Sequence, residues 1–184
     1  MVEYQYEIKV PKERVAILIG KKGEIKKKLE ETTGITLDID SKEGDVFVKG
    51  EDALHLYTAR EIIRAIARGF NPDVALLLMK GEYVLEVINL ADVAKSQANL
   101  QRIKGRVIGS GGKTRRLIEE LSEVHMSVYG KTICILGESE NIYIAKTAIQ
   151  NLLKGSPHSS VYRWLEKKRH EIRKRSILGN FEHG

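Results

Sequence analysis

The sequence predicts an α+β fold with two tandem units of order βααββα, each a three-stranded antiparallel sheet packed on helices, and then a C-terminal helix. The first observation is a repeat, because the segment from Gly20 to Gly23 returns 89 residues later as Gly109 to Gly112. Apolar residues recur at the same offset, for example Leu37 and Met126. A solenoid would need three or more short repeats, so one long unit that occurs twice indicates tandem domains.

Periodicity and turn signals place the elements of the first unit. Alternating apolar residues indicate a strand that Pro11 ends, while Gly34 and Asp52 are residue types that end and begin helices. The expected elements are a strand at 4–10, helices at 12–19 and 24–33, strands at 35–40 and 45–49, and a long helix after residue 52.

The second unit repeats this order after a boundary at Phe70-Asn-Pro-Asp73, where Pro72 suits the first turn of a short helix that runs to Met79. The expected elements are a strand at 83–90, helices at 101–108 and 113–122, strands at 124–129 and 132–136, and a helix at 140–153, with an insertion at 91–100. We therefore predict a first domain at 1–70, a connector at 71–82, a second domain at 83–155, and a basic C-terminal helix and tail at 156–184.

Basic residues are concentrated in three stretches. The formal net charge is only +6, yet residues 20–28, 102–116 and 163–175 together carry +15 and the rest of the chain carries −9. Two of these stretches surround the glycine turns, where attraction to phosphates would place them. The alternative is that the lysines and arginines only solvate helix faces.

A Gly-x-x-Gly turn between two helices can bind a phosphodiester backbone. Glycine has no Cβ, so backbone N–H groups and the N-terminus of the next helix come close to the phosphates. Lys21 and Lys22 lie between the glycines of the first turn, whereas Ser110 and Gly111 lie between those of the second. Positive charge at the second turn must then come from the flanking residues Arg102, Lys104, Arg106, Lys113, Arg115 and Arg116.

The Ile-Gly-x-x-Gly turn, followed by a hairpin and a long helix and present twice, resembles tandem type I KH domains. The resemblance implies that each unit binds about four nucleotides of single-stranded RNA or DNA. The turn would hold the backbone, and the second helix and the adjacent strand would form an apolar floor under the bases.

Carried over by position, the turn residues are Gly20, Lys21, Lys22 and Gly23 and then Gly109, Ser110, Gly111 and Gly112. The groove candidates are Val15, Ile19, Ile25, Leu37 and Ile39 in the first unit, and Arg106, Ile108, Thr114, Met126 and Val128 in the second. Core packing is the alternative for the apolar residues among them.

A closer resemblance covers residues 70–175. Asn71-Pro-Asp73, Leu85-Glu-Val-Ile88, Arg106 to Arg115 and Gly155 to Tyr162 resemble the archaeal form of the two-KH small-subunit ribosome assembly proteins, whose eukaryotic counterpart is the partner of the Nob endonuclease. The resemblance implies binding near the 3′ end of small-subunit ribosomal RNA or its precursor, and a role in ribosome maturation. It also implies the Nob-type endonuclease and the alpha subunit of initiation factor two as partners.

The function keeps one open alternative. Eukaryotic members often have a degenerate first KH domain, so the intact Gly20–Gly23 turn leaves open whether the first domain binds RNA or protein. The alternative to an RNA-binding assembly protein is therefore a protein-interaction adaptor in which the KH units act mainly as scaffolds.

The C-terminal helix is expected to pack on the second domain. Val161, Trp164, Leu165, Lys168 and Ile172 fall on one helical face. Lys167, Arg169, Arg173, Lys174 and Arg175 are expected in solvent. A role of Trp164 in base stacking is the alternative to docking.

Other classes of function find little support in the sequence. A P-loop that ends at Gly112-Lys113-Thr114 would need glycine at position 107, which is Val107, and a strand upstream where we expect a helix. The five histidines lack zinc-ligand spacing, Cys134 fits a buried strand position, and no apolar run has the length of a membrane span. We expect a cytoplasmic monomer that is no enzyme and needs no metal or cofactor.

Overall fold

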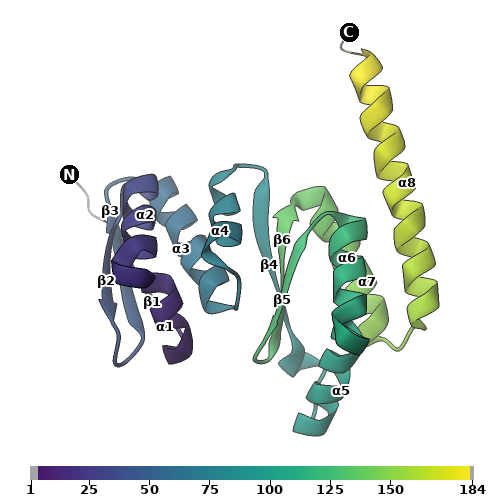
Figure 1. The fold of residues 1–184 in the computed structure, drawn as a ribbon, viewed down its shortest axis with the longest axis horizontal. Coiled ribbons are helices and arrows are strands. Elements are labelled where there is room, and N and C mark those ends of the chain that lie inside the picture. Colours follow the sequence, from purple (N-terminus) through teal and green to yellow (C-terminus); the bar gives the residue numbers. More distant parts are fainter. Residues whose placement is uncertain (1–3, 183–184) are drawn as a thin grey trace. The chain divides into compact units, whose positions relative to one another are not determined.

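The computed structural model describes residues 4–182, with side chains described through residue 174. The chain divides into two compact units, Met1–Leu85 and Glu86–Gly184. Each unit contains a three-stranded sheet and helices in the order βααββα, as the labels in Figure 1 show. The predicted fold, with two antiparallel sheets and a C-terminal helix, is confirmed.

In the first unit the sheet has the order β1-β3-β2. Strand β3 is central, and its residues Val46 and Val48 are fully buried against the helices. The elements are β1 (Tyr4–Lys9), α1 (Lys12–Ile19), η1 (Lys21–Gly23), α2 (Glu24–Thr33), β2 (Thr36–Asp40), β3 (Asp45–Gly50), α3 (Ala53–Ala67), α4 (Pro72–Ala75) and η2 (Leu76–Met79).

The helix boundaries of the first unit follow from local capping. Gly34 ends α2 in the left-handed conformation, with φ of 68°. The carboxylate of Asp52 accepts the backbone N–H of His55 at 2.8 Å, which starts α3 and holds the pKa of Asp52 below its ordinary value. Asn71 caps α4 in the same way through the N–H of Asp73. These boundaries agree with the sequence signals.

In the second unit the sheet has the order β4-β6-β5. The elements are β4 (Tyr83–Asn89), η3 (Leu90–Asp92), α5 (Gln97–Ile108), η4 (Ser110–Gly112), α6 (Lys113–Ser122), β5 (His125–Tyr129), β6 (Thr132–Glu138), α7 (Ser139–Leu153) and α8 (His158–Glu182).

The start of α5 differs from the prediction. The helix begins at Gln97, whereas we expected residue 101, because Oγ of Ser96 accepts the backbone N–H of Asn99 at 3.2 Å. The added turn buries Leu100, which is 5% exposed. The comparison with the first unit could not predict this cap, because residues 91–100 have no counterpart there.

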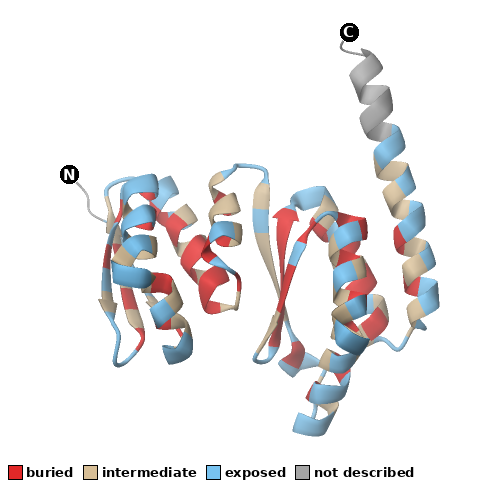
Figure 2. Ribbon diagram, in the orientation of Figure 1, coloured by how far each residue is buried: buried red, intermediate tan, exposed pale blue. Residues whose placement is uncertain are grey.

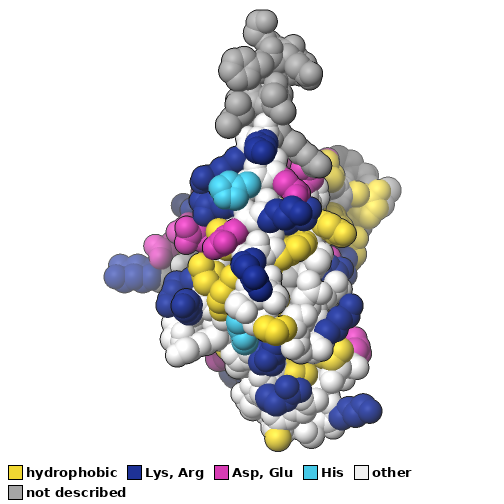
Figure 3. Space-filling model, turned by 90° about the vertical axis from the view of Figure 1, so that its right-hand side faces the viewer, with side chains coloured by type: hydrophobic (Ala, Val, Ile, Leu, Met, Phe, Trp, Pro, Cys, Tyr) yellow, Lys and Arg dark blue, Asp and Glu magenta, His cyan; other side chains and the backbone are white. Residues whose placement is uncertain are grey.

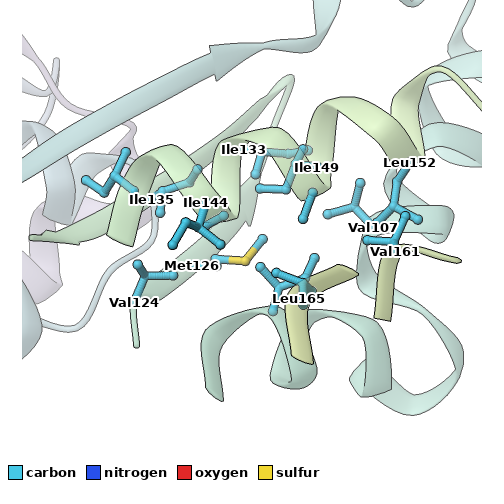
Figure 4. Packing of buried hydrophobic residues seen from close by; sticks show 14 of the residues in the cluster. Val107, Val124, Met126, Ile133, Ile135, Ile144, Ile149, Leu152, Val161 and Leu165 are labelled. Carbon is cyan, nitrogen blue, oxygen red and sulfur yellow. The ribbon is translucent and has the colours of Figure 1, made fainter. Parts of the chain in front are cut away.

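The core of the second unit lies between the sheet and the helices, where Figure 2 shows the buried positions in red. Ile133 and Ile135 of β6, Ile149 of α7 and Leu165 of α8 meet there (Figure 4). Cys134 is fully buried, as expected for a small apolar residue.

Apolar burial fastens α8 to the second unit. Val161 and Leu165 are 2% and 0% exposed, and burying two such side chains contributes about 1.5–3 kcal/mol each. The ion pair between Arg169 and Glu120 spans 3.4 Å, but Glu120 is 67% exposed, so it adds at most about 1 kcal/mol. The predicted docking of α8 is confirmed.

Two of the expected solvent positions on α8 have a different outcome. The expectation for Arg169 is wrong, because its side chain is 26% exposed and lies against α6. The side chain of Arg175 lies outside the described residues.

Candidate nucleic-acid interface

The two glycine turns have the same backbone conformation. The first glycine of each turn has φ and ψ of 76° and 175° at Gly20 and of 74° and 174° at Gly109. The agreement extends to the third residue, with 53° and 26° at Lys22 and 55° and 23° at Gly111, and to the last glycine, with 79° and 14° at Gly23 and 78° and 14° at Gly112. The fold therefore builds one and the same loop twice.

The first and last glycines of each turn serve different purposes. A Cβ on Gly20 would lie 2.5 Å from Cγ1 of Ile25, and one on Gly109 would lie 2.2 Å from Oγ1 of Thr114. The chain thus crosses directly over the next helix, where only glycine fits. A Cβ on Gly23 would meet nothing within 4 Å, so the outer side of the first turn is open to a ligand.

The third residue of the turn distinguishes the two copies. Lys22 and Gly111 both have positive φ. This conformation costs an L-residue about 1–2 kcal/mol but costs glycine little. The first turn therefore keeps a lysine in spite of backbone strain, while the second turn is unstrained and uncharged.

The lysines of the first basic stretch fall into two groups. Lys26, Lys27 and Lys28 each lie within 4.0 Å of a carboxylate, on Glu30, Glu31 and Asp73 respectively. Lys21 and Lys22 are exposed and form no hydrogen bond or ion pair with any residue that the structure describes. The charge that is available to a ligand therefore lies inside the turn.

At the second turn, most of the flanking cations already have partners. Lys104 donates to the carbonyl of Gly130 at 3.1 Å, Arg102 donates to Asn99 at 2.9 Å, and Arg115 lies 3.7 Å from Glu119. Within the described part of the chain, Lys113 and Arg116 are the flanking cations that are exposed and unpaired. A Cβ on Gly112 would lie 3.3 Å from Nη1 of Arg116, so this guanidinium reaches back over the turn.

Arg106 supports the fold from inside the second unit. Its Nε donates to the carbonyl of Leu152 at 3.1 Å, and its Nη2 donates to the carbonyl of Ser156 at 2.7 Å. In the first unit, Arg14 binds the carbonyls of Ile66 and Phe70 in the same manner. Both arginines close the end of the long third helix, so Arg106 has a supporting role in the fold, and its contact with RNA stays a prediction.

The groove candidates divide into core and surface positions. Met126 and Thr114 are 4% and 2% exposed, and Met126 is one of the core residues labelled in Figure 4. Val15 and Leu37 are buried in the core of the first unit. The candidates that keep partly exposed surface are Ile19, Ile25, Ile39, Ile108 and Val128.

Two glutamates that were not predicted from the sequence connect a helix to a strand in each unit. Oε1 of Glu30 accepts the backbone N–H of Leu37 at 2.8 Å, and Oε1 of Glu119 accepts that of Met126 at the same distance. Each glutamate joins the second helix of its unit to the strand that edges the groove. The signal was present in the sequence, because both members of the pair recur at the 89-residue offset.

The start of α8 fastens the helices on both sides of the second turn. Nε2 of His158 lies 2.8 Å from the carbonyl oxygen of Arg106, in the last turn of α5. The hydroxyl of Tyr162 lies 2.7 Å from Oγ1 of Thr114, at the start of α6. The motif Gly155 to Tyr162 therefore positions the second turn through contacts with the helices that precede and follow it.

The described residues give no sign of the other site types that we considered. They contain no group of three or more His, Cys, Asp or Glu side chains arranged to hold a metal. Helix α5 precedes the second turn, at the place where a P-loop has a strand. Among the helices of residues 4–182, none combines the length and the apolar character that a membrane crossing requires.

Two family models match the chain. A KH domain model matches residues 5–65, and a model of the eukaryotic type KH domain, type I, matches residues 84–170. A KH domain-containing protein of Methanocaldococcus jannaschii is 48% identical over 171 residues, which cover 91% of this chain and 75% of that protein. RNA-binding protein PNO1 of Oryzias latipes is 39% identical over 114 residues, and the match covers 61% of this chain and about half (47%) of that protein.

A solved structure agrees with these matches. It is the crystal structure of an a/eIF2alpha–aDim2p–rRNA complex from Pyrococcus horikoshii, in which the matched chain is 46% identical with a TM-score of 0.85. The alignment covers 92% of this chain and 96% of that one. Sequence and fold agree over both units, and the chain therefore belongs to the family of two-KH-domain proteins that includes archaeal Dim2 and eukaryotic PNO1.

Proposed function

We propose that the protein binds single-stranded RNA near the 3′ end of small-subunit ribosomal RNA or its precursor and assists ribosome maturation in the cytoplasm, without catalytic activity. The observation that carries the proposal is the shared backbone geometry of the two turns, which are open at Gly23 in the first and at Gly111 in the second. Each turn also has two exposed cations that form no hydrogen bond or ion pair with the described residues. Relatives named RNA-binding protein PNO1 and pre-rRNA-processing protein pno1 support the assignment.

The second turn is the principal RNA site in this proposal. Helix α2 begins with Glu24, whose carboxylate would oppose a phosphate at the helix N-terminus, whereas α6 begins with Lys113 and has no acidic residue in its first turn. Gly111 also adopts the turn without strain, and α8 holds the turn in place. Arg102, Lys104, Arg106 and Arg115 shape the site, while Lys113 and Arg116 contact phosphates.

Substitutions in the turns test this proposal. We expect Ser110→Asp/Gly111→Asp to weaken binding of a 3′-terminal small-subunit rRNA oligonucleotide about tenfold or more at ~0.15 M salt. Lys21→Asp/Lys22→Asp changes the net charge more than the first variant does, but it should weaken RNA binding less. The control Gln97→Asp/Ala98→Asp adds two carboxylates to the exposed first turn of α5 and should bind like the unmodified protein. Equal affinity of all three variants would refute the RNA role of the turns.

A second candidate function is that of an adaptor for the alpha subunit of initiation factor two. It is favoured by the structure from Pyrococcus horikoshii, in which a/eIF2alpha, aDim2p and rRNA form one complex. In that case the first domain binds protein, and the turn variants should leave binding of the alpha subunit unchanged in calorimetry. Nob-type endonuclease is a third partner to test in the same way. RNA affinity that does not depend on salt would favour the adaptor over the RNA-binding role.

A further inference from the structure

One line of basic side chains runs along the solvent face of α8. Arg163, Lys167, His170 and Lys174 are spaced at i, i+4, i+7 and i+11, which places them on one side of a helix. All four are exposed. Figure 3 looks onto this side of the molecule, where dark-blue Lys and Arg side chains lie along the described part of α8. We call these four residues the α8 stripe; it spans about 16 Å at 1.5 Å per residue.

The α8 stripe does not contribute to packing. Docking uses the opposite face, through Val161 and Leu165. Basic residues nearer to that face have partners, since Lys168 binds Glu171 at 2.6 Å and Arg169 lies near Glu120.

The α8 stripe also has no stabilising ion pairs. Its members form no hydrogen bond or ion pair with the residues that the structure describes. Like charges at i, i+4, such as Arg163 and Lys167, destabilise a helix by about 0.2–0.5 kcal/mol. The described contacts therefore give these side chains no structural role, and they are available to a ligand.

The α8 stripe begins beside the second turn and leads away from it. Tyr162, which precedes Arg163, contacts Thr114 at the start of α6, and Arg169 contacts Glu120 near its end. The two contacts advance in the same direction along both helices, so α6 and α8 run parallel. Figure 1 shows α8 continuing past the end of α6. A strand held by Lys113 and Arg116 could therefore pass directly onto the stripe.

We propose that the α8 stripe binds the phosphates of RNA that extends beyond the nucleotides held at the second turn. The inference rests on the proposed function of that turn. A KH groove holds only about four nucleotides. Arg163, Lys167 and Lys174 follow one another at about 6 and 10.5 Å along a rigid helix, so they can meet further phosphates of a longer strand. The stripe has no aromatic residue to stack on bases, so it adds affinity and direction without reading sequence.

Two RNAs of different length test the proposal. Both carry the 3′ end of an archaeal small-subunit rRNA, one about six nucleotides long, which fills the groove, and one about eighteen nucleotides long, which overhangs it. The variant is Arg163→Glu/Lys167→Glu/Lys174→Glu. Its control is Lys12→Glu/Lys80→Glu/Lys95→Glu, which changes the net charge equally at exposed positions outside both turns and α8. Fluorescence anisotropy over a range of salt concentrations measures both affinity and salt slope.

We expect the stripe variant to bind the short RNA like the unmodified protein and to bind the long RNA about tenfold more weakly. The slope of log K against log salt for the long RNA should fall by about 2, at roughly 0.7 per phosphate contact. An unchanged preference for the long RNA, or an equal loss in the control, would overturn the proposal. A protein that binds neither RNA would instead refute the proposed function, because the stripe is measured as a difference between the two lengths.

Discussion

The hydroxyl of Tyr162 in α8 lies 2.7 Å from Oγ1 of Thr114, the residue over which Gly109 crosses at the second turn. Ile25 occupies the equivalent place in the first unit, beneath Gly20, and has no hydroxyl to offer. The exchange of isoleucine for threonine at this position therefore accompanies the addition of α8. One contact links the second glycine turn, the helix that follows it and the C-terminal helix.

This link predicts coupled effects on stability. Tyr162→Phe should lower the free energy of unfolding by about 1–2 kcal/mol, because it leaves the hydroxyl of Thr114, which is 2% exposed, without its partner. Thr114→Val removes that hydroxyl, so the double variant should lose less than the sum of the single losses. Urea unfolding of the four proteins measures the coupling, and strictly additive losses would exclude it.

Gly109 and Gly112 should differ in their tolerance of alanine. Gly109→Ala combines a glycine-only backbone conformation with a Cβ that would lie 2.2 Å from Oγ1 of Thr114, so we expect a loss of about 3 kcal/mol or more. Gly112→Ala meets only a flexible arginine end at 3.3 Å and should lose about 1 kcal/mol. Thermal unfolding distinguishes the two, and equal losses would contradict the close crossing at Gly109.

Lys22→Gly should raise stability and reduce RNA binding at the same time. Glycine relieves the strain of φ at 53°, for a net gain of about 0.5–1 kcal/mol, but it removes a cation from the first turn. Lys21→Gly removes the same charge at a residue without positive φ and should destabilise instead. Calorimetric unfolding would show opposite signs for the two variants; a loss in both would mean that Lys22 is not strained.

Substitution of Arg106 should affect the stability of the fold, whereas substitution of Arg116 should affect RNA binding. Arg106→Lys cannot reach both carbonyls, so we expect a loss of about 1.5–3 kcal/mol in stability, with RNA affinity kept in the folded protein. Arg116→Gln should leave stability unchanged and lower the salt slope of RNA binding by about 0.7. Filter binding measures RNA affinity and thermal unfolding measures stability on the same preparations. Weaker RNA binding by Arg106→Lys with unchanged stability would show that Arg106 contacts the ligand.

The loss of stability at low pH should depend in part on Asp52. The backbone N–H of His55 lowers the pKa of its carboxylate in the folded protein. The stabilising contribution is therefore complete above the ordinary pKa of about 3.9 and is lost as pH falls through the lowered value. Asp52→Asn keeps a capping oxygen but cannot titrate. Its melting temperature should fall less than that of the unmodified protein between pH 5 and about pH 2; parallel curves would argue against the cap.

The tandem fold and the location of both turns follow from local features of the sequence. Gly20 and Gly109 indicate the loops, because only glycine combines their backbone conformation with so close a crossing over the next helix. Gly34, Asp52 and Asn71 marked helix ends for a similar local reason. The helix at 101–108 was predicted, but its true start at Gln97 was not, because the cap at Ser96 has no counterpart in the first unit.

Which cations are available to a ligand depends on contacts between distant parts of the chain, which the sequence does not reveal. The sequence offered six basic residues around the second turn, but the partners of Arg106 are 46 and 50 residues away and that of Lys104 is 26 residues away. Lys113 and Arg116 remain available because neither forms a hydrogen bond or an ion pair with the residues that the structure describes. An arginine reads the same in a sequence whether it closes a helix or faces a phosphate; long-range packing sets its partner and therefore its role.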